Sequence, residues 1–293
     1  NHIKYPVLVK PSDNSGARGI SICNNEKQLI NGYKNALKFS KSKEILIERY
    51  INGKEATIFY ILQDGEIYLS AMGNRHIKHN QDDVIALPVA YTFPSKHLEN
   101  YVKTTDTKVK EMFKSLGMKN GMVFMQCLVE NDKCIIYDIG YRLTGTLEYK
   151  LLEDICEYNP LEMMIYYSLT GDKAEPNLDE KVEPFWEKYG CNVSFLMKPG
   201  KIGKIKGVEH VKEIPEVIDV VLARVEGEEL PTTSKGTLSQ IMLRVFATTD
   251  NKENLKTLLE TIYNKLEVTS VEGDNLLLEG FDITELEEGV LVE

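Results

Sequence analysis

Residues 5–20 read YPVLVKPSDNSGARGI, a run of β-forming residues that ends at Lys10 and continues into a loop with Gly16 and Gly19. Backbone amides in such a loop can wrap an anion, and the lysine supplies a positive point charge. The spacing matches neither GxxxxGK[ST] nor GxGxxG, and an ordinary strand-to-turn junction would also explain it. Alone, the stretch leaves a phosphate site and a plain turn as alternatives.

Two later stretches carry polar residues at defined spacings. In ILIERYINGKEATI (45–58) an apolar strand leads into Glu48, and Glu55 follows seven residues later. In GMVFMQCLVENDKCIIYDIGYRLTGT (121–146) Gln126 stands twelve residues before Asp138, and Arg142 follows four residues after it. An exposed strand end would explain Glu48, and a cross-strand ion pair would explain Glu55.

In this order, the three stretches resemble the phosphate-binding entry, the adenine hinge with its ribose carboxylate, and the metal and phosphate motif of the ATP-grasp ligases. The resemblance spans about residues 5–171. It implies an α+β fold, in which an ATP-grasp clamp of two α+β subdomains is followed by a mixed, β-rich C-terminal domain. It also implies an ATP- and Mg²⁺-dependent ligase, with Mn²⁺ as an alternative metal, that joins a small carboxylate to an amine through an acylphosphate.

The resemblance gives the nucleotide a set of contacts. Lys10 and the loop after it would hold the phosphates, and Glu48 would accept a hydrogen bond from the adenine amino group. Backbone and apolar groups that follow Glu48 would contact the purine, and the oxygens of Glu55 would bind the ribose hydroxyls. The residues assigned to ATP are Lys10, Ser15, Gly16, Arg18, Gly19, Glu48, Arg49, Tyr50, Ile51 and Glu55.

The third stretch would supply the metal and catalytic groups. Gln126 and Asp138 offer hard oxygen ligands for Mg²⁺. Arg142 would stabilise charge on the transferred phosphoryl group, and Arg75, in MGNRHIKH, would hold a substrate carboxylate. His76 and His79 also stand three residues apart, but a polar loop explains them.

Gln126 and Asp138 can share a metal only if they lie on one face of the predicted hairpin. A three-residue loop at 131–133 would place them directly opposite each other, whereas a two-residue Asn131-Asp132 turn would place them on opposite faces. Turn chemistry slightly favours the shorter loop. The metal assignment therefore predicts either the longer loop or a β-bulge.

The third stretch departs from the usual family pattern, which has Glu-x-Asn-x-Arg where this chain has Asp138, Gly140 and Arg142. Because Gly140 cannot ligate a metal, one metal is better supported than two. We expect Gly140→Asn to restore the usual amide and to tighten Mg²⁺ binding or leave activity intact. The same departure motivates an alternative function, an ATP-binding regulatory module with attenuated catalysis.

Composition narrows the classes of protein. The chain has 293 residues, 42% of them apolar, and a formal net charge of −10, so no global basic field attracts nucleic acid or an anionic membrane. Five cysteines without a CxxC pair favour reduced thiols in the cytoplasm, and no apolar run is long enough for a membrane span or leader. We expect a part of a longer polypeptide that lacks the family's N-terminal domain, with a homodimer possible.

Periodicity and the polar, proline-containing stretch at 172–184 divide the chain into segments 1–72, 73–171, a linker at 172–184 and 185–293. The resemblance implies that the first two are the small (lid) and large ATP-grasp subdomains and that the last is a C-terminal ligase- or carboxylase-like domain. Helices are predicted over 26–41, between Pro94 and Gly117, from Asn159 to Gly171, and after an Asp250–Glu253 capping box. The second helix has the buried stripe Leu98, Tyr101, Val102, Val109, Met112, Phe113 and Leu116. Asp64-Gly65 is predicted to be a hairpin turn.

Overall fold

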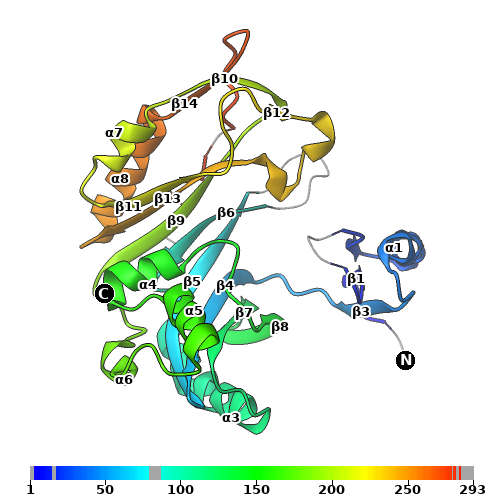
Figure 1. Cartoon of the computed structure of the whole chain (residues 1–293). Coiled ribbons are helices and arrows are strands. Elements are labelled where there is room, and N and C mark those ends of the chain that lie inside the picture. The colour runs from blue at the N-terminus through cyan, green and yellow to red at the C-terminus, as the bar shows by residue number, and fades with distance from the viewer. Residues whose placement is uncertain (1–2, 15–17, 79–86, 279, 282–283, 285–293) are drawn as a thin grey trace. The chain divides into compact units, whose positions relative to one another are not determined.

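The computed structural model describes residues 3–14, 18–78, 87–278, 280–281 and 284. It divides the chain into two compact units, Asn1–Gly53 and Lys54–Glu293. Both combine helices with mostly antiparallel sheet, which confirms the α+β class. Figure 1 traces the elements of each unit in chain order.

Unit 1 is a three-stranded antiparallel sheet with one helix against it (Figure 1). Its strands β1 (Val7–Pro11), β2 (Ser21–Cys23) and β3 (Ile45–Arg49) pair in the order β2-β1-β3. Helix α1 (Glu26–Phe39) begins as predicted, because the Asn25 side chain accepts a hydrogen bond from the Gln28 amide at 3.0 Å. The core of the unit comprises Val7, Val9, Cys23 and Ala36.

Helix α1 packs against its sheet through small residues. Gly32 and Ala36 are buried, whereas Ile30 and Tyr33 are 49% and 43% exposed. A Cβ at Gly32 would lie 2.9 Å from the Cys23 sulfur, so the helix approaches the sheet more closely than a larger side chain would allow.

Unit 2 is built on an eight-stranded antiparallel sheet in the order β11-β13-β9-β6-β5-β4-β7-β8. A second sheet has the order β12-β10-β14. The strands are β4 (Lys54–Gln63), β5 (Glu66–Lys78), β6 (Leu87–Phe93), β7 (Gly121–Glu130), β8 (Lys133–Gly140), β9 (Tyr189–Leu196), β10 (Gly200–Lys206), β11 (Val217–Leu222), β12 (Glu229–Leu230), β13 (Ile241–Thr249) and β14 (Glu267–Ser270).

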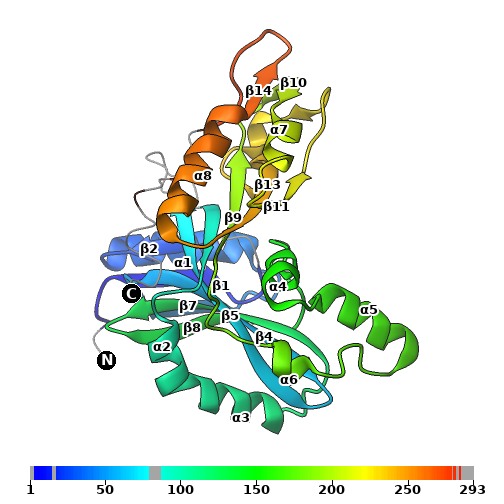
Figure 2. The ribbon, with the colours of Figure 1, turned by 90° about the vertical axis from the view of Figure 1, so that its left-hand side faces the viewer.

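Helices cover both faces of the eight-stranded sheet (Figures 1 and 2). Alternate residues of β4 belong to different cores: Phe59 and Ile61 pack with helices α4 (Tyr149–Cys156) and α5 (Pro160–Thr170), whereas Ile58 and Tyr60 pack with α2 (Leu98–Tyr101) and α3 (Thr107–Ser115). We call the face of Phe59 the α4 face. Short helices α6 (Leu178–Lys181) and α7 (Val208–Lys212) and the longer α8 (Lys252–Lys265) follow.

A π-helical turn at Val102–Asp106 joins α2 to α3 and changes the phase of the predicted stripe. Leu98, Tyr101, Val109 and Phe113 are buried as predicted, but Met112 and Leu116 are 36% and 67% exposed. Those two assignments to the core were wrong, because a strict 3.6-residue period does not allow for the wider turn.

Turn and cap chemistry is largely as predicted. Asp64 and Gly65 have φ of 53° and 88° and close the β4–β5 hairpin. Asn159 caps α5, and Gly171 ends it with a φ of 78°. Helix α8 differs by one residue, because Asn251 and not Asp250 accepts the capping hydrogen bond, from the Asn254 amide at 2.8 Å.

The observed division of the chain differs from the predicted segments. Strands β4 and β5 are hydrogen-bonded within the sheet of unit 2, so residue 72 lies inside that sheet, and the first unit ends at Gly53. The segment 172–184 contains α6, and β6 pairs with β9 across it. Segments 73–171 and 185–293 therefore contribute strands to one continuous sheet.

We expect Gly73→Ala to destabilise unit 2 by about 1–3 kcal/mol, the usual cost of overpacking a core. Gly73 pairs with Thr57, and a Cβ there would lie 2.5 Å from the Phe93 ring, which stacks on Trp186 at a centroid distance of 5.1 Å. Denaturant unfolding would measure the loss. Gly145→Ala is the control, because a Cβ at Gly145 meets no atom within 4 Å. It should change the free energy of unfolding by less than about 0.5 kcal/mol. Equal losses of stability in the two variants would contradict the steric explanation.

Candidate functional site

The β7–β8 hairpin brings the two predicted metal ligands together. Asn131 and Asp132 form a two-residue turn with φ of 50° and 61°. Pairing then runs regularly as far as Cys127 and Ile136, where Tyr137 is an extra, bulged residue. Because of this bulge Gln126 lies directly opposite Asp138, and the predicted β-bulge is confirmed.

A third polar side chain continues this row on the neighbouring strand. Thr57 of β4 is the partner of Gln126, and the three side chains share the α4 face. Thr57 is 1% exposed, yet its hydroxyl oxygen has no hydrogen-bond partner among the described residues. A buried orphan of this kind, beside an amide oxygen and an exposed carboxylate, fits a site that binds a polar ligand.

The donor set of this row suits Mg²⁺ better than a metal held by protein alone. Within the described ranges, no group of three or more His, Cys, Asp or Glu residues could hold a metal ion. Mg²⁺ commonly binds through one or two carboxylates and completes its octahedron with water and phosphate oxygens. Gln126 and Asp138 fit that mode.

Phe124 fills the space beside Gly140. The two residues are strand partners, and a Cβ at Gly140 would lie 2.2 Å from the Phe124 ring. The ring is 4% exposed and belongs to the core beneath α4. An asparagine at this position therefore has no room unless the Phe124 ring moves, and this clash argues against our prediction that Gly140→Asn tightens Mg²⁺ binding or leaves activity intact.

The same ring holds Arg142. The Arg142 guanidinium carbon lies 4.8 Å from the centroid of Phe124, in cation–π geometry, and Nη1 donates to the Leu143 carbonyl at 2.9 Å. The exposed arginine is thus oriented by a buried ring and by its own backbone. This placement leaves the predicted phosphoryl role open and gives the side chain a defined position.

Glu55 and Arg75 form an ion pair across β4 and β5, where they are strand partners. The Tyr137 hydroxyl also donates to Glu55 at 3.2 Å, and Arg75 Nε donates to the Tyr91 hydroxyl at 3.2 Å. The cross-strand pair is the alternative explanation for Glu55. The two residues predicted to bind ribose and substrate carboxylate therefore lie together and neutralise each other, and both roles remain predictions.

His76 lies in strand β5 and not in a polar loop. It is 7% exposed, and Nε2 lies 2.8 Å from the Thr92 hydroxyl. His79 lies outside the described residues. Because His76 is buried against its strand neighbour, it is a structural residue.

In unit 1, Lys10 and Glu48 form an ion pair of 2.7 Å on neighbouring strands. Their side chains are 20% and 44% exposed, so the pair is accessible to solvent and worth at most about 1 kcal/mol. A weak pair can open for a stronger partner. The geometry therefore permits the predicted contacts of Lys10 with phosphate and of Glu48 with adenine.

The loop after Lys10 is anchored by a residue that we did not single out from the sequence. Asp13 accepts hydrogen bonds from the amides of Lys41 at 2.8 Å and Ser42 at 2.6 Å, and the Ser42 bond is the main cause that lowers the pKa of this carboxyl. Gly19 has a φ of 81°, and a Cβ there would lie 2.9 Å from Phe39. The sequence could not predict this contact, because Asp13 and the residues just after helix α1 are 28 and 29 positions apart in the chain.

The remaining nucleotide residues have different outcomes. Ser15 and Gly16 lie outside the described residues. Arg18 and Arg49 are exposed, and each makes an interaction within the structure. Tyr50 and Ile51 are partly exposed after β3, and the Tyr50 amide donates to the Pro6 carbonyl at 3.2 Å. Nothing in this geometry excludes their predicted contacts.

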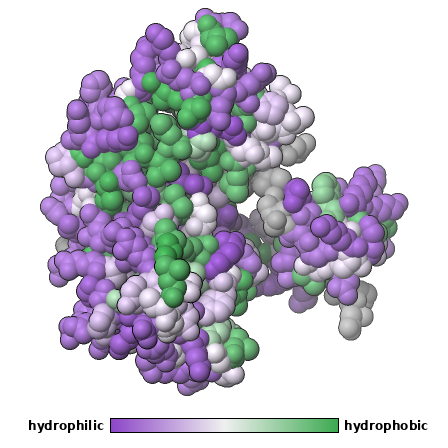
Figure 3. Space-filling model, in the orientation of Figure 1, coloured by the Kyte–Doolittle hydropathy of each residue, from purple (hydrophilic) through white to green (hydrophobic). Residues whose placement is uncertain are grey.

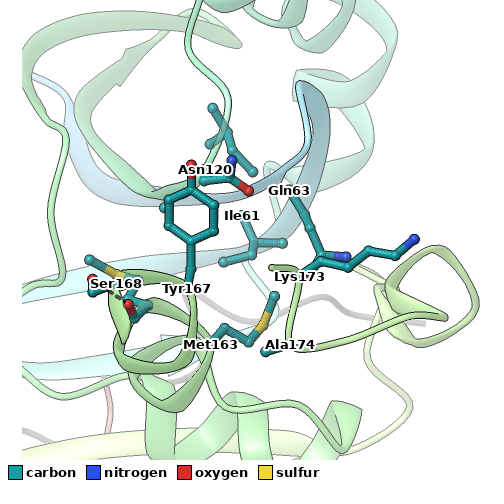
Figure 4. Close-up of a pocket in the computed structure, with 11 residues that line it drawn as sticks. Ile61, Gln63, Asn120, Met163, Tyr167, Ser168, Lys173 and Ala174 are labelled. Carbon is teal, nitrogen blue, oxygen red and sulfur yellow. Dashed lines mark hydrogen bonds between the residues drawn. The ribbon is translucent and has the colours of Figure 1, made fainter. Parts of the chain in front are cut away.

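A pocket of about 240 Å³ lies at the α5 end of the sheet (Figure 4). None of the predicted site residues lines it, and the Gln63 side chain is bonded to the backbone of Glu175. Nearby, Figure 3 shows a hydrophobic strip over α5, where Ile165 and Leu169 are 50% and 80% exposed. The pocket and the strip are separate from the Thr57, Gln126 and Asp138 row.

Comparison with known proteins gives the family. Residues 3–147 match the sequence profile of the ATP-grasp domain. Similar solved structures include phosphoribosylglycinamide synthetase from Anaerococcus prevotii, with a TM-score of 0.70 and 17% identity, and L-amino acid ligase from Bacillus licheniformis, with 0.71 and 16%. A third is the biotin carboxylase domain dimer of Hydrogenobacter thermophilus 2-oxoglutarate carboxylase, with MgADP, ADP and bicarbonate, at 0.73 and 17%.

Residues 3–147 of the chain belong to the ATP-grasp superfamily, as the three motifs indicate, and the solved structures share the fold of nearly the whole chain. The matches cover 92%, 92% and 97% of this chain, and 65%, 64% and 61% of those proteins. The chain thus spans less than two thirds of each relative, and identities this low establish the fold alone. Within the described residues, no helix is long and apolar enough to cross a membrane.

We expect Gly140→Asn and Phe124→Ala to be strongly non-additive. The first substitution forces a clash at 2.2 Å, and the second removes a core ring at a cost of about 3–5 kcal/mol. Together they relieve the clash and partly refill the cavity, so a double-mutant cycle by denaturant unfolding should give a coupling energy of about 0.5–3 kcal/mol.

The control for this cycle pairs Gly140→Asn with Phe113→Ala. Phe113 is also buried, but it packs in the core on the opposite face of the sheet. Here the losses should add to within about 0.5 kcal/mol. Additivity in the Phe124 pair would show that the ring is not the obstacle.

Proposed function

We propose that this chain is the ATP-binding and C-terminal portion of a carboxylate–amine ligase that uses ATP and Mg²⁺, or Mn²⁺, and proceeds through an acylphosphate. The observation that carries the proposal is the bulge-dependent pairing of Gln126 with Asp138, beside the unpartnered Thr57 hydroxyl. An ATP-grasp domain with hard oxygen donors in one row has the ligands that Mg²⁺ takes when phosphates fill its other positions.

In this proposal ATP supplies the phosphoryl group that activates a carboxylate. Lys10 and the loop amides of unit 1 neutralise and orient phosphate oxygens, and Glu48 exchanges its ion pair with Lys10 for an adenine amino group. The planar fork of Arg142, held over Phe124, stabilises charge on the group in transfer. Positioning and electrostatics account for most of the rate in such transfers.

Glu55 and Arg75 have linked roles in the same proposal. Because the two side chains are paired, Glu55 can bind ribose hydroxyls with its remaining acceptor positions only while Arg75 holds its orientation. A substrate carboxylate that approached Arg75 would compete with Glu55. Nucleotide and substrate affinities should therefore be coupled at this pair.

A second candidate function is a nucleotide-responsive module with attenuated catalysis. Gly140 has no side chain to bind a metal, and the Phe124 ring occupies the space where the usual motif has one. Position 140 therefore supplies no ligand for a second metal. ATP binding without phosphate release, across a panel of carboxylates and amines in the full-length protein, would favour this module over the ligase.

The expected partners are a small carboxylate and a small amine, and a homodimer is an open possibility. All five cysteines are free thiols, which is consistent with a cytoplasmic protein. The net charge of −10 argues against nucleic acid as a partner.

Lys10→Ala should weaken ATP binding by about 1.5–3 kcal/mol, the range for a hydrogen bond to a charged group, and should leave adenosine nearly unaffected. The reason is that the lost charge faces phosphate and not the base. Calorimetric titration of both ligands measures the difference. Lys38→Ala, an exposed lysine on α1, is the matched control and should change neither affinity. Equal losses for ATP and adenosine would place Lys10 elsewhere.

Asp138→Asn should abolish Mg²⁺-dependent ATP turnover in the full-length protein, because Asp138 is the one proposed metal ligand with a negative charge. Phosphate release at saturating ATP is the measurement. Asp132→Asn is the control: it lies in the turn of the same hairpin with a φ of 61°, which asparagine tolerates, and it should retain turnover. Full turnover of Asp138→Asn would exclude this metal assignment.

A further inference from the structure

The pocket at the α5 end of the sheet has walls from segments that are far apart in the sequence. Ile61 and Leu62 of β4, Met163 of α5 and Ala174, which follows the helix, supply apolar walls. Ile61, Leu62 and Met163 are 1%, 2% and 8% exposed, so these walls are also part of the packed interior of unit 2. Core packing therefore fixes the shape of the pocket.

The segment after α5 is held against the sheet beside the pocket. The Gln63 side chain donates to the Glu175 carbonyl at 2.6 Å and accepts a hydrogen bond from the Glu175 amide at 3.3 Å. The Glu175 carboxylate forms an ion pair with Lys181 at 3.0 Å, and Leu178 is 1% exposed. The pocket is thus formed in the absence of a ligand, as most small-molecule sites are.

The unused N–H groups at the pocket belong to Asn120 and Lys173. Asn120 Oδ1 accepts a hydrogen bond from the Asp64 amide at 3.0 Å, and the amide nitrogen of Asn120 has no partner in the described part of the chain. Lys173 forms no ion pair with any described residue. No Asp or Glu lines the pocket. A cation and an amide donor without an opposing carboxylate favour an anionic ligand.

The walls favour an aromatic ring. Figure 4 shows the Tyr167 ring extending from α5 toward Asn120, and the side chain is 39% exposed. Met163 and Met164 line the same pocket, and thioether sulfur and aromatic rings both make favourable contacts with a ring. The volume of about 240 Å³ lies below the roughly 300–1,000 Å³ of sites for drug-sized ligands, so it suits a single ring with a short acidic arm.

We propose that this pocket binds a small aromatic carboxylate as an effector. The ring lies against Tyr167 and Met163, and the carboxylate is bound by Lys173 and by the amide nitrogen of Asn120. Lys173 is exposed at the rim, and its flexible stem lets the ammonium group turn over the opening. Because none of the residues predicted to bind ATP or metal lines the pocket, this is a second site.

The pocket is connected to Arg142 through Tyr141. The Tyr141 hydroxyl donates to the Asn120 carbonyl, and a Cβ at Gly121 would lie 3.1 Å from the Tyr141 ring. Arg142 follows Tyr141 in the chain and lies over the Phe124 ring. A ligand that immobilises Asn120 therefore also restrains Tyr141 and the backbone that carries Arg142. Because a second ligand need not order what the first has already ordered, the effector and ATP should tighten each other's binding.

The first test is a ligand-observed NMR titration of the full-length protein with benzoate, phenylacetate and 3-phenylpropionate. We expect at least one of the three to bind with a Kd of about 0.1–10 mM, the range for ligands of this size. The amine with the same ring and arm, and acetate, which lacks the ring, should each bind at least tenfold more weakly. Failure of all three acids to bind, or equal binding of the amine, would overturn the proposal.

Substitution of Lys173 places the ligand in this pocket. Lys173→Met should weaken the best of the three acids at least fivefold, and Lys173→Glu should weaken it further, because the charge at the rim is reversed. Lys108→Met is the matched control, since Lys108 is an exposed lysine on α3 that does not line the pocket. It should bind the acid like the wild type. Wild-type affinity in both Lys173 variants would show that the acid binds elsewhere.

The second test measures the connection to Arg142. Saturation with the best acid should tighten ATP binding, measured by calorimetry, about fivefold, within the usual range of coupling between sites. The same concentration of acetate should not. Tyr141→Phe keeps the ring beside Gly121 but loses the hydrogen bond to Asn120, so it should bind the acid within twofold of the wild type and lose most of the coupling.

The outcomes separate the effector site from the proposed function. Equal ATP affinity with and without the acid, or full coupling in Tyr141→Phe, would overturn the effector role. ATP turnover is not needed for either test, so a protein that binds ATP without ligating would still reveal the coupling. A protein that binds no ATP would remove the proposed function, and the titration with the three acids would still decide whether the pocket is a site.

Discussion

A single bulged residue decides whether the two proposed metal ligands lie on the same face of the sheet. With the two-residue turn at Asn131 and Asp132, a regular β7–β8 ladder would place Gln126 and Asp138 on opposite faces of the sheet. Tyr137 is the extra residue that restores the register, and its hydroxyl then bonds to Glu55 on β4. The bulge thus sets the face of the proposed metal ligand and also connects the hairpin to the Glu55 and Arg75 pair.

The sequence allowed a good part of this architecture to be predicted. Turn and cap residues act locally, so Asp64-Gly65, the Asn159 cap and the need for a bulge were all visible in the chain. Contacts between distant strands were not: the row of Thr57, Gln126 and Asp138 depends on β4 lying next to β7, which the linear sequence does not reveal. The predicted boundary at residue 72 differs from the observed one at Gly53 for the same reason. The sequence of the β4–β5 hairpin does not show that β4 pairs with β7 and β5 with β6.

Gly140 illustrates how a departure from a family pattern can be structural as well as chemical. From the sequence, Gly140 differs from the usual motif only by lacking a metal-ligating side chain, which Gly140→Asn would restore. The structure shows two linked changes, because the Phe124 ring takes the vacated space and supplies a flat surface for Arg142. With this aromatic platform and a neutral amide at Gln126, the proposed metal site has fewer protein charges than the usual motif, so phosphate and water would supply more of the coordination of a bound metal.

The eight-stranded sheet of unit 2 limits where the chain can be truncated. Strand β6 pairs with β9 through four residue pairs, and these strands lie on either side of the polar 172–184 segment. Cleavage and removal of everything after that segment would expose the edge of β6, a row of unpaired amides and carbonyls next to apolar core. An edge of this kind recruits other strands. We therefore expect that a fragment ending at the 172–184 segment would be prone to aggregate, and that the strands after residue 184 must be kept together with the hairpins before it.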